Sequence, residues 1–305
     1  HAAMAYGASI TLKRLEDCGK SPWPLAWRTI FQPAEETATG ARRMIDAGAL
    51  EDVGSIYALH VEPTRPTGEI GIRAGALTAH CDSVRIDVHG QGGHGARPHE
   101  SKDPIAAAAH IISTLYQFVP RATDSMDAVV LTIGCVRGGQ NPNVIPERVQ
   151  LTGTLRTLEA GVRLKTIEHI HQLARGVGEI TDTHIEVAFE ASIPSVYNAP
   201  AAVKTLEDAA VGVVGRERLR KVPRPSMGSE DFACYLEQRP GAMFRLGVAG
   251  DMSQITPLHT PRFDIDEAAL QIGVRVLAGA VVADCRPSDL GPKGQRSSIL
   301  GENRA

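Results

Sequence analysis

The stretch SVRIDVH, residues Ser83–His89, alternates between apolar and polar side chains. Its apolar residues are Val84, Ile86 and Val88, and a polar residue follows each of them. Since successive side chains of a strand point to opposite faces, these three fall on one face. The pattern predicts a β-strand that packs one face against a core and leaves the other face in water.

The elements after this strand predict a β-α-β-β-α-β order. Asp103 and Pro104 are typical of a helix start, an N-cap followed by proline at the first helical position. After this helix we predict two strands, a second helix and a last strand, over residues 128–136, 148–157, 161–177 and 184–191. This order is that of the ferredoxin-like split unit. Residues 79–192 are therefore expected to form a separate α/β domain.

The segments on either side predict an α/β domain into which the first one is inserted. A strand, a helix and a strand are predicted over 25–31 (LAWRTIF), 39–50 and 55–61 (SIYALHV), a βαβ unit of a parallel sheet. A helix, a strand and a last helix follow over 201–215, 242–248 and 266–285. We expect a discontinuous domain of residues 1–78 and 193–285, and a disordered polar tail of residues 286–305.

The composition narrows the class of protein. The chain has 305 residues, 43% of them apolar, which is enough for the cores of two domains. A net charge of −3 without long like-charge blocks argues against a nucleic-acid partner, and no run is long and apolar enough to predict a membrane span. Five scattered cysteines without a CxxC pair favour reduced thiols, so we expect a cytoplasmic protein.

Two adjacent glutamates, Glu35 and Glu36, stand between a predicted strand and a predicted helix. Their side chains can share one site only if the chain bends between them, and Pro33 just ahead favours a bend. One carboxylate could then hold a metal ion while the other takes a proton from water. The alternative is a solvated helix N-terminus, where the helix dipole favours acidic side chains.

Two histidines are further candidates. His60 ends a predicted buried strand, at the edge where open α/β sheets bind ligands, and the alternative is a histidine of the core. His259 lies between two prolines in a loop, where a neutral imidazole suits a metal ion, and the alternative is a surface histidine. Glu230 and Asp231 precede an apolar helix and are predicted to cap it.

Three candidates lie in the predicted inserted domain. His94 lies in the glycine-rich stretch HGQGGHGARPH, where the glycines favour close backbone approach. A role for it in the other domain needs a hinge motion or a second subunit. Asn143 lies in QNPNVIP, and Arg156 lies in GTLRT. Arginine is the usual partner of a substrate carboxylate, and the alternative is a surface arginine on the wet face of a strand.

Seven motifs occur together and in order: FQPAEE, LHV, GQGGHGARPH with DPI, NVIP, GTLRT, GSEDF and PLHTPRFD. In this combination the chain resembles the M20 metallopeptidase family, and within it the amidohydrolases that cleave N-acyl amino acids, hippurate and indole-acetyl amino acid conjugates. The resemblance implies a metal-binding α/β catalytic domain interrupted by a ferredoxin-like lid domain that forms a homodimer. It also implies hydrolysis of the amide bond of a small N-acyl amino acid.

The resemblance gives each candidate a role. Glu35 matches the general base, and His94 matches the lid histidine that reaches the partner subunit's site and polarises the scissile carbonyl. The implied metal ligands are Glu36, His60 and His259, and the implied substrate contacts are Asn143 and Arg156, with Arg156 on the carboxylate. The implied cofactor is a divalent ion, zinc or manganese, with two ions in each subunit of the full-length enzyme.

The start of the chain departs from this pattern. The chain begins at His1 inside a predicted helix, without a cap or strand before it, which is typical of a fragment. In the family a CGHDxH segment supplies a cysteine and a histidine ligand just before this helix, and His1 matches its last histidine. We therefore expect an N-terminally truncated catalytic domain. The alternative function is a catalytically incompetent homologue whose lid domain mediates dimerisation.

Overall fold

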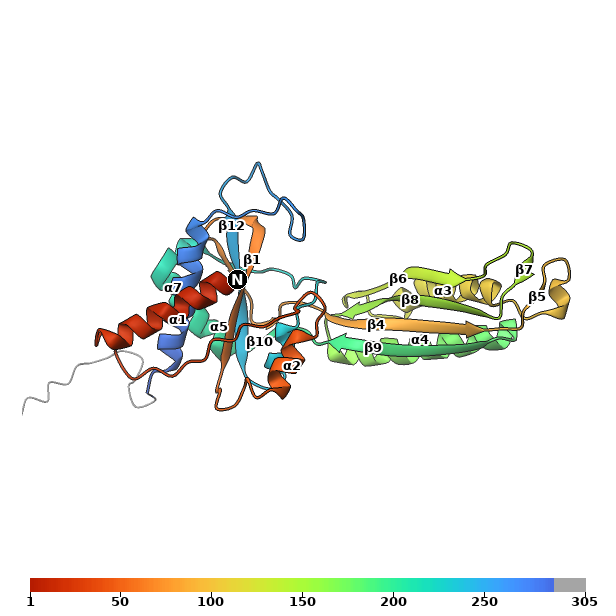
Figure 1. Cartoon of the computed structure of the whole chain (residues 1–305), viewed down its shortest axis with the longest axis horizontal. Helices are drawn as coiled ribbons and strands as arrows, with labels where there is room; N and C mark the ends of the chain where they lie inside the picture. Colours follow the sequence, from red (N-terminus) through yellow and green to blue (C-terminus); the bar gives the residue numbers. More distant parts are fainter. Residues whose placement is uncertain (288–305) are drawn as a thin grey trace, which may run out of the picture.

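The structure, a computed structural model, describes residues 1–287 (Figure 1). A mixed sheet holds the strands β1 (Ile56–Pro66), β12 (Gly241–Ala249), β2 (Ile70–Ile72) and β11 (Leu219–Lys221), in the order β1-β12-β2-β11. β1 and β12 are parallel, whereas β12 and β2 are antiparallel. Apolar side chains of this sheet pack against α1 (Ala2–Asp17), α5 (Pro200–Val214) and α7 (Ala268–Asp284). A parallel pair sandwiched in this way explains the nearly unbroken apolar run of β12.

A second sheet is antiparallel throughout, with the order β6-β8-β4-β9. Its strands are β4 (His80–His89), β6 (Val129–Gly138), β8 (Arg148–Thr157) and β9 (His184–Ile193). The apolar face that SVRIDVH predicted packs against α3 (Pro104–Ala122) and α4 (Ala160–Thr181) in a core of its own. Along the chain the elements follow the predicted β-α-β-β-α-β order, and the Asp103 side chain caps α3 as expected.

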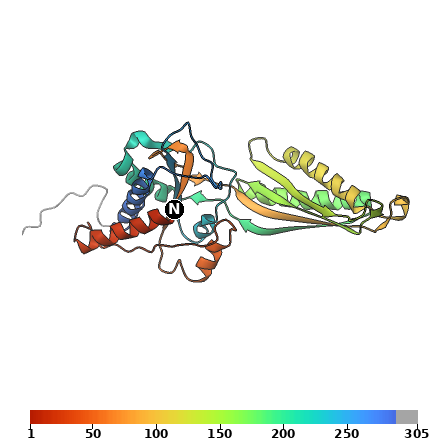
Figure 2. The same cartoon turned by 45° about the horizontal axis from the view of Figure 1, so that its top comes forward.

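The two sheets lie one after the other along the long axis of the molecule, as Figures 1 and 2 show. Where the chain passes into the second sheet, the buried Asp82 accepts hydrogen bonds of 2.7 and 2.6 Å from Arg163 of α4. Arg42 donates to the Ser192 carbonyl oxygen at 2.9 Å and so links the glutamate-bearing part of the chain to the end of β9. These contacts hold in place the end of the second sheet that lies nearest to the first sheet.

Shorter elements complete the described part of the chain. α2 (Gly40–Asp46) and α6 (Phe232–Leu236) flank the first sheet, and β3 (Gly75–Ala76) pairs with β10 (Tyr197–Asn198). β5 (Gly93–His94) pairs with β7 (Val144–Ile145) at the far end of the second sheet, beside the 3₁₀ turn Pro98–Glu100. Another 3₁₀ turn, Arg216–Arg218, leads into β11. No helix within residues 1–287 is both long enough and apolar enough to cross a membrane.

The predicted strand over residues 25–31 is wrong: none of the described strands pairs with this segment, and it forms no β-structure. The parallel partner of β1 is β12, so the predicted βαβ unit is also wrong. A strand exists only where a neighbour satisfies its backbone groups, and sequence pattern cannot show whether that neighbour is present. The helix predicted over 39–50 ends earlier, at Asp46. Of the predicted tail, residues 288–305 lie outside the described part of the chain.

Candidate functional site: a carboxylate and histidine cluster

A tight turn carries the two adjacent glutamates. Ala34 and Ala38 both have positive φ angles, 56° and 53°, and the Ala38 amide donates to the Glu35 carbonyl oxygen at 2.7 Å. The predicted bend next to Pro33 is therefore present. The turn ends at Gly40, where a side chain could not fit because its Cβ would lie 1.7 Å from the Pro33 carbonyl oxygen.

Hydrogen bonds to the Asp231 carboxylate hold both ends of this turn. Its carboxylate accepts two hydrogen bonds of 2.8 Å from the Gln32 side chain, just before the turn. It also accepts one of 3.1 Å from the backbone N–H of Ala41, just after the turn. Asp231 is 1% exposed, so these bonds are shielded from water. Asp231 stands at the N-cap position of α6, but its side chain makes no capping hydrogen bond to that helix. The prediction that Asp231 caps this helix is therefore wrong, because its side chain holds the glutamate turn instead.

Glu230 brings a second carboxyl group to Glu35. Ligand atoms of Glu35, Glu230 and Asp231 all lie within 4.8 Å of one another. Glu35 stands on an exposed turn, yet its carboxyl group faces the buried Glu230. Burial, reinforced by the Glu35 carboxylate, raises the pKa of Glu230 to about 8. Burial also raises the pKa of Glu35, although its hydrogen bond with Glu230 opposes the shift.

His60 lies beside this carboxylate group, on β1. Its Nε2 atom is 3.9 Å from a carboxylate oxygen of Glu230, and its side chain is 18% exposed. Burial lowers the pKa of His60 to about 4, and the neighbouring cation of Arg245 on β12 adds to the shift. The imidazole is therefore neutral at pH 7, as a metal ligand must be. The His1 ring stacks at a tilt on His60, with 4.6 Å between the ring centroids.

Glu36, the second glutamate of the turn, contacts His259. The Nδ1 atom of His259 is 3.1 Å from a carboxylate oxygen of Glu36, and both side chains are exposed. His259 has a φ of 60°, an unusual conformation for a residue other than glycine. Such strain is often found at functional sites. His259 is near enough to Glu35 and His60 to influence the pKa of each.

The three candidates of the second sheet do not join this cluster within one chain. His94 lies on β5 and Asn143 precedes β7, at the end of the second sheet farthest from β1 (Figure 1). Arg156 lies at the near end, and its Nη1 atom donates to the Met227 carbonyl oxygen at 2.7 Å. Since Met227 is three residues before Glu230, Arg156 stands between the second sheet and the loop that carries Glu230.

The donor set fits a divalent cation. Three carboxyl groups gather in one place, and the raised pKa of Glu230 reports the repulsion and desolvation that a cation would relieve. Among the described residues, Glu36, His60 and His259 are not part of this group: His60 lies 3.9 Å from Glu230, and His259 lies 3.1 Å from Glu36. Oxygen and imidazole donors of this kind accept several first-row divalent ions. Glu230 and Asp231 were missed as site residues because a carboxylate before a helix is most often a cap, and only the GSEDF motif hinted otherwise.

These features belong to a known family of hydrolytic enzymes. The family model "Peptidase family M20/M25/M40" matches residues 1–283, and the chain is a member of this family. It is 43% identical over 254 residues to a probable hydrolase of Synechocystis sp. and 36% identical over 255 residues to N-acetylcysteine deacetylase of Bacillus subtilis. These matches cover 83% and 84% of this chain and 65% of each relative.

Solved structures of the family share its fold. A putative aminohydrolase from methicillin-resistant Staphylococcus aureus superposes with a TM-score of 0.75 at 31% identity, over 83% of this chain and 65% of that one. A dinuclear metal-binding M20 peptidase of Bacillus subtilis gives a TM-score of 0.68 at 33% identity, over 83% and 63%. The chain therefore has the mixed α/β fold of M20 structures and spans about two thirds of their length.

The pKa of Glu230 predicts a pH dependence for the metal-free chain. Because this pKa rises from 4.5 to about 8 on folding, the stabilising contribution is complete below pH 4.5 and is lost as the pH rises through about 8. The contribution of His60 to stability depends on pH in the opposite direction. Because folding lowers the pKa of His60 from 6.5 to about 4, this contribution is present above pH 6.5 and is lost as the pH falls below 6.5. Between pH 6.5 and 8 the His60 contribution therefore does not offset the Glu230 effect.

We expect Glu230→Gln to flatten the fall in unfolding free energy between pH 6.5 and 8 by up to about 1.4 kcal/mol per pH unit. Urea unfolding at several pH values, with a chelator present, measures this slope. Glu168→Gln, on the exposed face of α4, is the matched control and should leave the slope as it is. An unchanged slope in Glu230→Gln would show that Glu230 is ionised throughout this range.

Proposed function

We propose that this chain carries the general base and part of the metal centre of an amidohydrolase that cleaves N-acyl amino acids. The observation that carries the proposal is the turn that directs Glu35 toward Glu230, which lies beside His60, and that brings Glu36 to His259. The names of the relatives support the substrate class, since they include deacetylases of N-acetylcysteine and N-acetyldiaminopimelate. This chain spans about two thirds of the length of these relatives, and the complete activity is proposed for a polypeptide of their full length.

In this mechanism Glu36, His60 and His259 hold a divalent ion, zinc or manganese. When bound, the ion lowers the pKa of a water molecule toward neutrality and stabilises negative charge on the substrate oxygen. Glu35 takes the proton of the attacking water and later passes it to the leaving amine. The raised pKa of Glu35 suits this task, because a stronger base accepts the proton more readily.

We also propose that residues 79–192 are a lid and dimerisation domain inserted between residues 1–78 and 193–285. The position of His94 and Asn143 supports this division, because both lie far from Glu35 of their own chain (Figure 1). In a homodimer the partner's lid tip brings the same residues to the cluster. His94 then polarises the substrate carbonyl, and Asn143 contacts the substrate beside it.

Arg156 is proposed to bind the carboxylate of the amino-acid half. Replacement of Arg156 by alanine should raise KM for an N-acyl amino acid by about 10- to 100-fold, the loss expected for a charged hydrogen bond. The corresponding N-acyl amino acid amide lacks the carboxylate and should be hydrolysed equally well by both proteins. Equal KM increases for the acid and the amide would assign Arg156 a structural role, through its bond to Met227.

The test of the function is hydrolysis of N-acetylated amino acids and hippurate by the longer polypeptide, with and without a divalent metal. Metal-dependent release of the free amino acid supports the proposal. Absence of hydrolysis together with formation of a stable dimer through residues 79–192 would instead support the alternative, an inactive homologue with a dimerising lid.

A further inference from the structure

The second sheet has a strained bulge at the end nearest to the first sheet. There, Asp82 of β4 stands alone opposite two residues of β9, Ala191 and Ser192. Ala191 has a φ of 44°, a left-handed conformation that is unfavourable for a residue other than glycine. Such a conformation persists only where the surrounding contacts fix it. The contacts of the neighbouring Ser192 therefore decide the shape of this bulge.

Two arginines from different parts of the chain bind Ser192. Arg163 of α4 donates to the Ser192 hydroxyl at 3.3 Å, and its other bonds go to the buried carboxylate of Asp82. Arg42 of α2 donates to the Ser192 carbonyl oxygen at 2.9 Å. Arg163 thus holds the bulge from within the second sheet, whereas Arg42 connects the bulge to the segment that carries the two glutamates.

Arg42 stands at the end of the glutamate turn. It follows Ala41, whose backbone N–H donates to Asp231, and it belongs to the first turn of α2. Burial raises the pKa of the Cys234 thiol of α6, and the nearby cation of Arg42 opposes this shift. The Arg42 side chain therefore lies near α6 as well as β9, where three segments of the chain meet.

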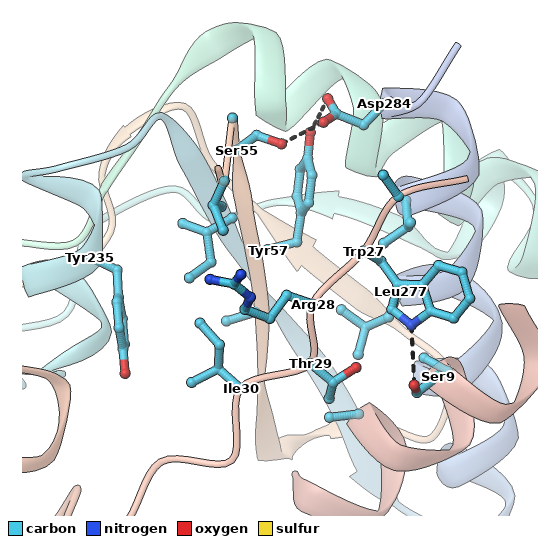
Figure 3. Close-up of a pocket in the computed structure, with 18 of the residues that line it drawn as sticks. Ser9, Trp27, Arg28, Thr29, Ile30, Ser55, Tyr57, Tyr235, Leu277 and Asp284 are labelled. Carbon is cyan, nitrogen blue, oxygen red and sulfur yellow. Dashed lines mark hydrogen bonds between the residues drawn. The ribbon is translucent and has the colours of Figure 1, made fainter. Parts of the chain in front are cut away.

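The beginning of the turn has less support from packing. A cavity of about 480 Å³ lies between residues 26–30 and β1, with Tyr235 of α6 at one side (Figure 3). Residues 26–30, which lead into the turn, therefore do not pack closely on β1. The position of the turn depends correspondingly more on the contacts at its other end, at Ala41 and Arg42.

We propose that Arg42 is a positioning residue of the hydrolytic site, which sets the position of the glutamate turn against the Ser192 bulge. This role rests on the proposed function, in which Glu35 is the general base. Arg42 touches no reacting atom, but its bond to Ser192 fixes the start of α2, and the start of α2 fixes the end of the turn. Because Asp82 and Arg163 hold the same bulge, the position of the second sheet is passed to Glu35 through this bond.

Replacement of Arg42 by alanine tests the role in a form extended to the full length of the matched relatives. We expect kcat for an N-acyl amino acid to fall about tenfold with KM little changed, because a displacement of the base by less than 1 Å already lowers the rate. Arg42→Lys keeps a donor for the Ser192 carbonyl oxygen and should recover most of the rate.

The matched control is Arg43→Ala. Arg43 is the next residue of α2 and is also exposed, and its side chain makes no hydrogen bond or ion pair with any residue that the structure describes. This variant should keep its kcat. Equal kcat values in Arg42→Ala and Arg43→Ala would overturn the proposal.

Amide hydrogen exchange tests the same role without hydrolysis. In this chain, a peptide that covers residues 34–41 should exchange at least about threefold faster in Arg42→Ala than in Arg43→Ala, because the hydrogen-bonded amides of Ala38 and Ala41 are held less firmly. A peptide of β12 should exchange equally in both. Equal exchange of residues 34–41 would overturn the proposal. Faster exchange without hydrolysis in any form would instead reject the proposed function and leave Arg42 as the residue that positions the turn.

A second substitution tests whether the bulge is the anchor. Arg163→Lys keeps a positive charge beside Asp82 but loses the planar fork that also reaches Ser192. It should lower kcat in the extended form and have no further effect once Arg42 is replaced by alanine, since the bulge then no longer acts on the turn. Effects that multiply in the double variant would overturn the proposal, as would a normal kcat in Arg163→Lys alone.

Discussion

Replacement of Glu35 by glutamine is expected to lower the turnover of an N-acyl amino acid by about 100- to 10,000-fold, the usual contribution of a general base. Glutamine has nearly the same shape and can still hydrogen-bond to Glu230, but it cannot accept a proton from water. Glu36, His60 and His259 keep their positions, so bound metal should be unchanged. Initial rates and metal content of the purified variant measure the two effects separately.

The matched control is Glu168→Gln, which removes one carboxylate from the exposed face of α4 and should leave turnover unchanged. If Glu35→Gln hydrolyses the substrate at the normal rate, Glu35 is not the base. If the variant loses metal together with activity, Glu35 is a ligand instead. In that event the pairing of Glu36 with His259 would have another purpose.

Replacement of Asp231 by alanine should be nearly as damaging, although Asp231 is a positioning residue and touches no substrate. The change removes three hydrogen bonds that hold Gln32 and Ala41 at the two ends of the glutamate turn. Displacement of a catalytic group by about 1 Å can cost about 100-fold in rate. We expect a fall of that size in kcat, with KM for the substrate little changed.

Stability should also decrease, since the Ala41 amide is left buried without a partner, at a cost of about 1–3 kcal/mol. Asp231→Asn is the informative comparison, because its side-chain oxygen can still accept from Ala41, and the Gln32 amide can flip to pair with its NH₂ group. The asparagine variant should regain most of the rate. Equal loss of kcat in both variants would mean that the charge of Asp231, and not its position, matters to the reaction.

The second sheet was predictable because its evidence is local. β4, β8 and β9 each carry an alternation of apolar and polar residues, and Asp103 with Pro104 marks the helix start within two residues. The bend at the two glutamates was predictable for a similar reason, because Pro33 and the helix after the turn leave the chain little choice. Such signals are complete within a few residues, so no knowledge of distant neighbours is needed.

The predictions that failed depend on contacts between segments that lie far apart in the sequence. Residues 25–31 have the composition of a strand, but the neighbour that would make them one is not among residues 1–287. Asp231 stands before a helix, as a cap does, and only the fold brings it to Gln32, 199 positions away. The same holds for Glu230 and Glu35, whose mutual effect on pKa depends on the packing of two distant segments.

The most direct test of the account is to measure bound metal and hippurate hydrolysis for this chain and for a form extended to the full length of the matched relatives. We predict hydrolysis by the longer form with about two divalent ions per chain, and loss of activity on chelation, as its dinuclear relative suggests. Full metal content without hydrolysis of any N-acyl amino acid, or no bound metal in either form, would contradict the account.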